Sequence, residues 1–98
     1  MTDEIGVDRE DDGGIQGRYV IHLEGDREAE LTYAKREDGA LIAQHTFVPP
    51  SHRGRGLADK LVGRLIEDAR AGGYKIAPTC SYVIAQFRRH PEWADLHA

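Results

Sequence analysis

The hydrophobic positions along the chain change their spacing near residue 50. Between residues 15 and 48 apolar residues alternate with polar ones, which is the pattern of strands that bury one face. Gly25-Asp26 and Asp38-Gly39 separate three such runs and let the chain reverse, and Pro49-Pro50 ends the third. The inward positions are expected to be Tyr19, Ile21 and Leu23, then Ala29, Leu31 and Tyr33, then Leu41, Ala43, His45 and Phe47. The pattern predicts a meander of three antiparallel strands.

After residue 56 the apolar spacing lengthens to about 3.6 residues, the repeat of an amphipathic helix. This helix is predicted over 57–71, and Gly72-Gly73 ends it. A short strand over 74–77 and a second helix over 82–89 follow, and the second helix ends before Pro91. A right-handed crossover should make the third and fourth strands parallel neighbours. The sequence therefore predicts an α/β (α+β) fold of order β-β-β-α-β-α, with a mixed, mostly antiparallel sheet.

Length and composition restrict the chain to one domain, because 98 residues are too few for two independent cores. Residues 1–14 hold six acids and one base, so we expect a disordered acidic leader before a domain at 15–98. Cys80 is the only cysteine, which excludes an intramolecular disulfide and favours a reducing compartment. No stretch has the pattern of a membrane span or a signal peptide, so we expect a cytoplasmic protein. Whether it is a monomer or a homodimer stays open.

The charge of −4 is unevenly distributed between the two halves. Residues 1–48 carry 5 Lys/Arg and 12 Asp/Glu, a net of −7, whereas residues 49–98 carry 8 and 5, a net of +3. The basic residues do not gather in a stripe that would follow a phosphate backbone, so no nucleic-acid partner is expected. The histidines are scattered and the acids lack the spacing of an ion loop, so no metal site is expected either.

The segment Arg53-Gly54-Arg55-Gly56-Leu57-Ala58 lies where the third strand leads into the long helix. Unpaired amide N–H groups and the positive end of the helix dipole attract anions there, and glycine lets a phosphate approach the backbone. Arg53 and Arg55 add positive charge. A diphosphate ligand is the inference, and the alternative is that the glycines only shape a tight turn.

The same loop resembles the (Gln/Arg)-x-x-Gly-x-(Gly/Ala) signature of the GNAT superfamily of acetyl-CoA-dependent N-acetyltransferases, with Arg53, Gly56 and Ala58 at the fixed positions. Over residues 15–96 the chain is similar to a family of very small GNAT-like proteins. This similarity rests on Ala29-Glu30-Leu31-Thr32-Tyr33, His45-Thr46, the glycine loop and Pro78-Thr79-Cys80-Ser81-Tyr82-Val83. The resemblance implies a minimal GNAT fold and bound coenzyme A or acetyl-CoA.

The resemblance also implies a set of site residues. The pyrophosphate would be held by the amides of Arg53, Gly54, Arg55, Gly56, Leu57 and Ala58, and the pantetheine arm would pair with the backbone of Phe47 and Val48. Cys80 and His45 would lie nearest the thioester as candidate catalytic residues. A helix start beside Cys80 favours the thiolate, with His45 as its base, and direct transfer with His45 deprotonating an amine is the other route. Both residues also fit ordinary core positions.

Two functions follow from these observations. The first is acetyl transfer from acetyl-CoA to an amine, with an exposed amine on a protein favoured because the helices and strands that enclose the acceptor in larger relatives have no counterpart in the pattern. The second is a non-catalytic coenzyme A-binding or protein-interaction module. Tyr82 is not assigned a catalytic role, and the histidines outside the site are expected at the surface: His22, His52, His90 and His97.

Overall fold

The computed structural model of the chain describes residues 6–11 and 13–98. Five strands form one sheet in the order β1-β2-β3-β4-β5: β1 Asp8–Asp11, β2 Gln16–His22, β3 Glu28–Lys35, β4 Leu41–Phe47 and β5 Ile76–Pro78. The α-helices in this part of the chain are α1 Leu57–Gly72 and α2 Ser81–Arg89, and short 3-10 helices cover Glu24–Asp26, Pro50–His52 and Pro91–Leu96. No helix among these residues is long and apolar enough to cross a membrane.

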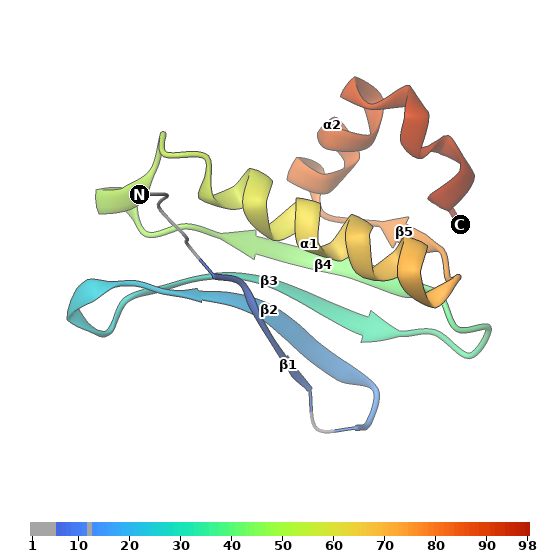
Figure 1. The fold of residues 1–98 in the computed structure, drawn as a ribbon, viewed down its shortest axis with the longest axis horizontal. Coiled ribbons are helices and arrows are strands. Elements are labelled where there is room, and N and C mark those ends of the chain that lie inside the picture. The colour runs from blue at the N-terminus through green and yellow to red at the C-terminus, as the bar shows by residue number, and fades with distance from the viewer. Residues whose placement is uncertain (1–5, 12) are drawn as a thin grey trace.

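The sheet is mixed and mostly antiparallel, as predicted. Strands β1 to β4 pair antiparallel in succession, and β5 pairs parallel to β4 after the crossover through α1. Helix α1 lies across one side of the sheet, which we call the helix face, and α2 lies at the β4–β5 edge (Figure 1). The side of the sheet opposite α1 is called the open face. The expected α+β fold is confirmed, with one strand more than the sequence predicted.

The core lies between α1 and the helix face, because the apolar row of α1 meets the inward residues of β2 and β3. Leu61 and Leu65 of α1 are fully buried, and so are Tyr19, Leu31 and Tyr33 of the sheet. Burying each such side chain contributes about 1.5–3 kcal/mol. The helix ends as predicted, because Gly73 adopts φ 72° and its amide donates to Ala69 O.

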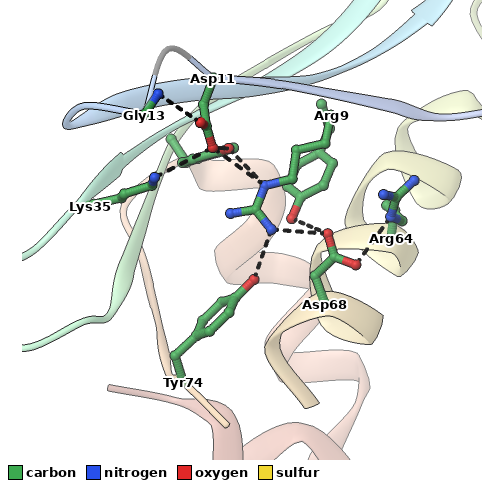
Figure 2. Close-up of polar contacts among 9 residues, drawn as sticks. Arg9, Asp11, Gly13, Lys35, Arg64, Asp68 and Tyr74 are labelled. Atoms are coloured by element: carbon green, nitrogen blue, oxygen red, sulfur yellow. Dashed lines mark hydrogen bonds and ion pairs between the residues drawn. The ribbon is translucent and has the colours of Figure 1, made fainter. Parts of the chain in front are cut away.

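The start of the fold differs from the expectation of a disordered leader over residues 1–14. Asp8–Asp11 form β1, which pairs antiparallel with β2, so the expectation is wrong for these residues. For residues 1–5 and 12 it lies outside the described residues. The charged strand is held by Arg9, whose guanidinium donates to Tyr33 Oη at 2.9 Å and to Asp68 Oδ2 at 3.2 Å (Figure 2). A polar strand can join a core when its charge is paired there.

A β-bulge in β4 changes which side chains face the core. Ala43 lies opposite Tyr33, but His45 lies opposite Thr32, so Gln44 is an extra residue. Residues directly opposite each other share a face, and the bulge therefore reverses the alternation beyond Ala43. The predicted inward positions are correct up to Ala43 and wrong for His45 and Phe47, which lie on the open face. Thr46 instead lies opposite Leu31 on the helix face.

Candidate functional site

The two parallel strands, β4 and β5, are not paired beyond Ala43. Their register ends at the pair Ala43 and Pro78, and proline has no amide hydrogen with which to continue a ladder. The carbonyl of Ala43 accepts hydrogen bonds from the amides of Thr79 and Cys80, both at 3.0 Å, and from the Thr79 hydroxyl at 2.9 Å. The chain then enters α2, while β4 continues to Phe47. The pairing of the two strands therefore ends at this point, and Cys80 lies between the end of β5 and the start of α2.

The glycine loop leads into α1 with left-handed backbone angles. Gly54 has φ 83° and Gly56, the N-cap of α1, has φ 75°. Among the described residues no side chain caps this helix start, and the first helical bond runs from Lys60 N to Gly56 O at 3.2 Å. A Cβ placed at either glycine would meet nothing within 4 Å, so the loop backbone borders open space. The amides of the first turn are thus left for a ligand, and the helix dipole favours an anion.

A cleft of about 410 Å³ lies between this loop and the end of β4. Seven of the eight residues predicted to bind the coenzyme line it: Phe47, Val48, Arg53, Gly54, Gly56, Leu57 and Ala58. Arg55 is exposed and is not among the lining residues. Arg53 fastens the loop to the strand, because its Nε donates to Val48 O at 3.1 Å.

Cys80 is the N-cap residue of α2 and is partly buried against the core. Its Sγ lies 3.5 Å from Thr46 Oγ1, and it is a free thiol. Burial raises the pKa of this thiol, but hydrogen bonds from the Thr46 hydroxyl and from backbone amides of the first turn of α2 outweigh burial, and the net pKa is lowered. A lowered pKa increases the share of the thiolate, which is the nucleophilic form.

His45 is exposed on the open face, whereas Cys80 contacts the helix face through Thr46. The structure therefore does not bring the two predicted catalytic residues together on one face. Sequence reasoning missed Thr46, because unbroken alternation selects His45 as the inward residue of the His45-Thr46 pair. The alternation of apolar and polar residues gives no sign of the bulge at Gln44, so it could not correct this choice.

The glycine loop, both α-helices and strands β3 to β5 lie in the part of the chain that a family model recognises. The model of the GCN5-related N-acetyl-transferase family matches residues 18–96. The chain belongs to this family. The match runs from β2 through the loop, α1 and α2, and β1 lies outside it.

In this N-acetyltransferase family member a polar cluster joins the first turns of the two helices. Tyr82 Oη donates to Asp59 Oδ1, and Gln86 Nε2 donates to Asp59 Oδ1 and to Tyr82 Oη, both at 3.1 Å. Burial, together with the hydrogen bond to the Asp59 carboxylate, raises the pKa of Tyr82 to about 12. Tyr82 thus stays protonated at neutral pH, and its ring and Asp59 line the cleft.

Two further features were not anticipated from the sequence. His52 was expected at the surface but is only 7% exposed, with its Nδ1 2.8 Å from Ser51 Oγ, and it lines the cleft. Asp59 and Gln86 were not singled out, because residues 27 apart reveal their contact only once α1 and α2 are packed. Within the described residues no cluster of His, Cys, Asp and Glu could hold a metal ion.

Proposed function

We propose that the protein is an N-acetyltransferase that binds acetyl-CoA in the cleft and transfers the acetyl group to an amine. The observation that carries the proposal is the start of α1, where amides that no side chain of residues 6–11 and 13–98 caps border the cleft. Membership of the GCN5-related N-acetyl-transferase family supports the same conclusion. A diphosphate suits this place, because its charge matches the helix dipole and its oxygens accept from the amides.

The chain's own groups define how the donor would be held. The amides of the loop from Arg53 to Ala58 would bind the pyrophosphate, and Arg55 would reach it from the exposed side of the loop. The backbone of Phe47 and Val48 would pair with the pantetheine amides, since β4 lacks β5 as a neighbour there. Acetyl-CoA supplies the activated acetyl group as a thioester.

Cys80 and His45 are proposed to act from the two sides of the sheet. Cys80 contacts Thr46, which lines the cleft, and the pKa of its thiol is lowered. His45 lies on the open face, where an amine that approaches from that side would meet an imidazole able to take its proton. Both routes are compatible with this placement: direct attack by the amine, or an acetyl group carried briefly by Cys80.

The test is intact-protein mass spectrometry after incubation with acetyl-CoA, with and without an added amine. The proposal predicts transfer to a lysine-containing peptide or a small amine, with comparison of the two deciding which acceptor class is used. An acetyl group on wild type that is absent from Cys80→Ala indicates the route through the thiol. Transfer that persists in Cys80→Ala indicates direct attack. Coenzyme binding without transfer to any amine would contradict the enzyme and favour a non-catalytic binding module.

A further inference from the structure

The bulge in β4 decides which side chain faces Cys80. In an unbroken strand His45, two residues after Ala43, would share its face. Because Gln44 is an extra residue, Thr46 lies opposite Leu31 on the helix face and His45 opposite Thr32 on the open face. The bulge therefore places the Thr46 hydroxyl, and not the His45 imidazole, beside the Cys80 thiol.

Thr46 is the residue that joins the cleft to the thiol. Thr46 lines the cleft and its Oγ1 lies 3.5 Å from Cys80 Sγ, whereas Cys80 itself is not among the lining residues. Cys80 is fixed from the other side, because its amide donates to Ala43 O at 3.0 Å and its carbonyl accepts from Ile84 N at 2.9 Å. These bonds hold the backbone of Cys80 beside β4, where its Sγ reaches Thr46 Oγ1.

We propose that Thr46 is a positioning residue that orients the Cys80 sulfur toward the cleft and stabilises its thiolate by donating a hydrogen bond. This rests on the proposed function, since the thiolate matters only if a thioester is bound in the cleft. A hydroxyl is suited to the task because it can accept from the thiol and donate to the thiolate without changing its own protonation. His45, on the opposite face, is not the base for this thiol.

The step that Thr46 assists can be written with all atoms in place. The Cys80 thiolate forms a carbon–sulfur bond to the acetyl carbon, the bond to the coenzyme sulfur breaks, and the coenzyme leaves as a thiolate that takes a proton from solvent. An amine nitrogen then attacks the acetyl carbon, Cys80 leaves as its thiolate again, and the nitrogen loses one proton. Thr46 keeps its own proton throughout.

The titratable groups of the neighbouring elements set the background for a pH test. Tyr82 on α2 and Asp59 on α1 are bonded to each other, and His45 on β4 lies on the other face. Loss of the Thr46 hydroxyl should therefore shift one ionisation, that of Cys80, without adding or removing another. Loss of a base would instead remove an ionisation from the profile.

The experiment measures the rate of alkylation by iodoacetamide against pH. Cys80 is the only cysteine, so the reaction reports on it alone. Thr46→Val removes the hydroxyl and keeps the shape, and Thr46→Ser retains the hydroxyl. Thr32→Val is the matched control, because it makes the same change on the neighbouring strand but on the open face. Thr46→Ala is a second removal of the hydroxyl, and thermal unfolding checks that each variant is folded.

Thr46→Val and Thr46→Ala are expected to raise the midpoint of the profile by about one pH unit, the equivalent of a tenfold loss of thiolate. Because a more basic thiolate is also a better nucleophile, the net loss of rate near neutral pH is about threefold. Thr46→Ser should return the midpoint to that of wild type, and Thr32→Val should leave it in place. Acetylation of Cys80 at saturating acetyl-CoA should slow in Thr46→Val.

An unchanged midpoint in both folded hydroxyl-free variants would overturn the inference. An equal shift in Thr32→Val would also overturn it, because the effect would then come from the sheet in general. The proposed function fails by a different result, namely no binding of acetyl-CoA by wild type. The alkylation profiles remain decisive for Thr46 in that case, so the two failures are distinguishable.

Discussion

Asp68 on α1 is the residue whose loss should damage the fold most for the smallest change of shape. Its Oδ2 accepts from Tyr19 Oη at 2.7 Å and from Arg9 at 3.2 Å, and its Oδ1 accepts from Arg64 Nε at 3.1 Å. Tyr19 is fully buried, so its hydroxyl has no water to replace the carboxylate. Arg9 belongs to β1, and Asp68 therefore also ties the first strand to α1 (Figure 2).

Asp68→Asn keeps the shape, removes the charge and replaces one accepting oxygen with an amide that cannot accept. A hydrogen bond to a charged group contributes about 1.5–3 kcal/mol, and the Asp68 side chain is 22% exposed, which lowers the ionic share. We therefore expect a loss of about 2–3 kcal/mol in the free energy of unfolding. For a domain of this size each kcal/mol lowers Tm by roughly 4–8 °C.

The assay is urea unfolding followed by circular dichroism, with Asp95→Asn as the matched control. Asp95 pairs with Arg70 at 3.0 Å, but the two side chains are 63% and 45% exposed, so its loss should change stability by less than about 0.5 kcal/mol. A cost of Asp68→Asn below about 1 kcal/mol, or equal to that of the control, would refute the reasoning that the cluster anchors β1.

The same cluster gives a pH dependence with a defined sign. Burial raises the pKa of Asp68, but hydrogen bonds from Tyr19 and Arg64 outweigh it and lower the pKa below its usual value. A lowered folded-state pKa gives stability that is complete above about pH 3.9 and is lost as pH falls through the folded-state pKa. The stability gap between wild type and Asp68→Asn should therefore shrink on acidification, and a gap that widens there would contradict the assignment.

Two further predictions concern glycines and the tyrosine of the cleft. Gly17→Ala should destabilise by about 1–3 kcal/mol, because its Cβ would lie 2.4 Å from Tyr33 Oη, whereas Gly63→Ala on α1 meets open space and should stabilise by about 0.5–1 kcal/mol. Thermal unfolding checks both, and equal effects would contradict the packing. Asp59→Asn should lower the pKa of Tyr82 from about 12 toward its ordinary value, as followed by phenolate absorbance, and an unchanged titration would show that Asp59 does not hold the proton.

The helices and strands whose apolar residues recur at a regular spacing were predictable from the sequence. The alternation of β2 and β3 and the helical rows of α1 each follow from one buried face, and Gly73 ends α1 as its type suggests. The parallel pairing of β4 and β5 followed from the handedness of crossovers. The glycine loop lies at the helix start because its residue types and its place in the order of elements agree.

The incorrect predictions concern places where the local structure depends on residues that are distant in the sequence. The residues of β1 looked too polar to join the fold. The charge of Arg9 is paired with Asp68, which lies 59 residues later and could not be identified as its partner from the sequence. The bulge at Gln44 reversed the facing of His45 and Thr46, and alternation carries no information about such an insertion. Tyr82 and Asp59 meet only because α2 packs beside the start of α1.

The most direct test of the cradle at the start of α1 is calorimetric titration of coenzyme A into wild type, Gly56→Asp and Gly25→Asp. Both glycines have positive φ, 75° and 71°, and an added Cβ meets nothing at either, so the two variants carry the same strain and the same added charge. Gly25 lies in the 3-10 helix Glu24–Asp26, outside the cleft lining. We predict binding to wild type and Gly25→Asp and none to Gly56→Asp, because a carboxylate would then occupy the anion site. Equal binding by all three, or no heat with wild type, would contradict the account.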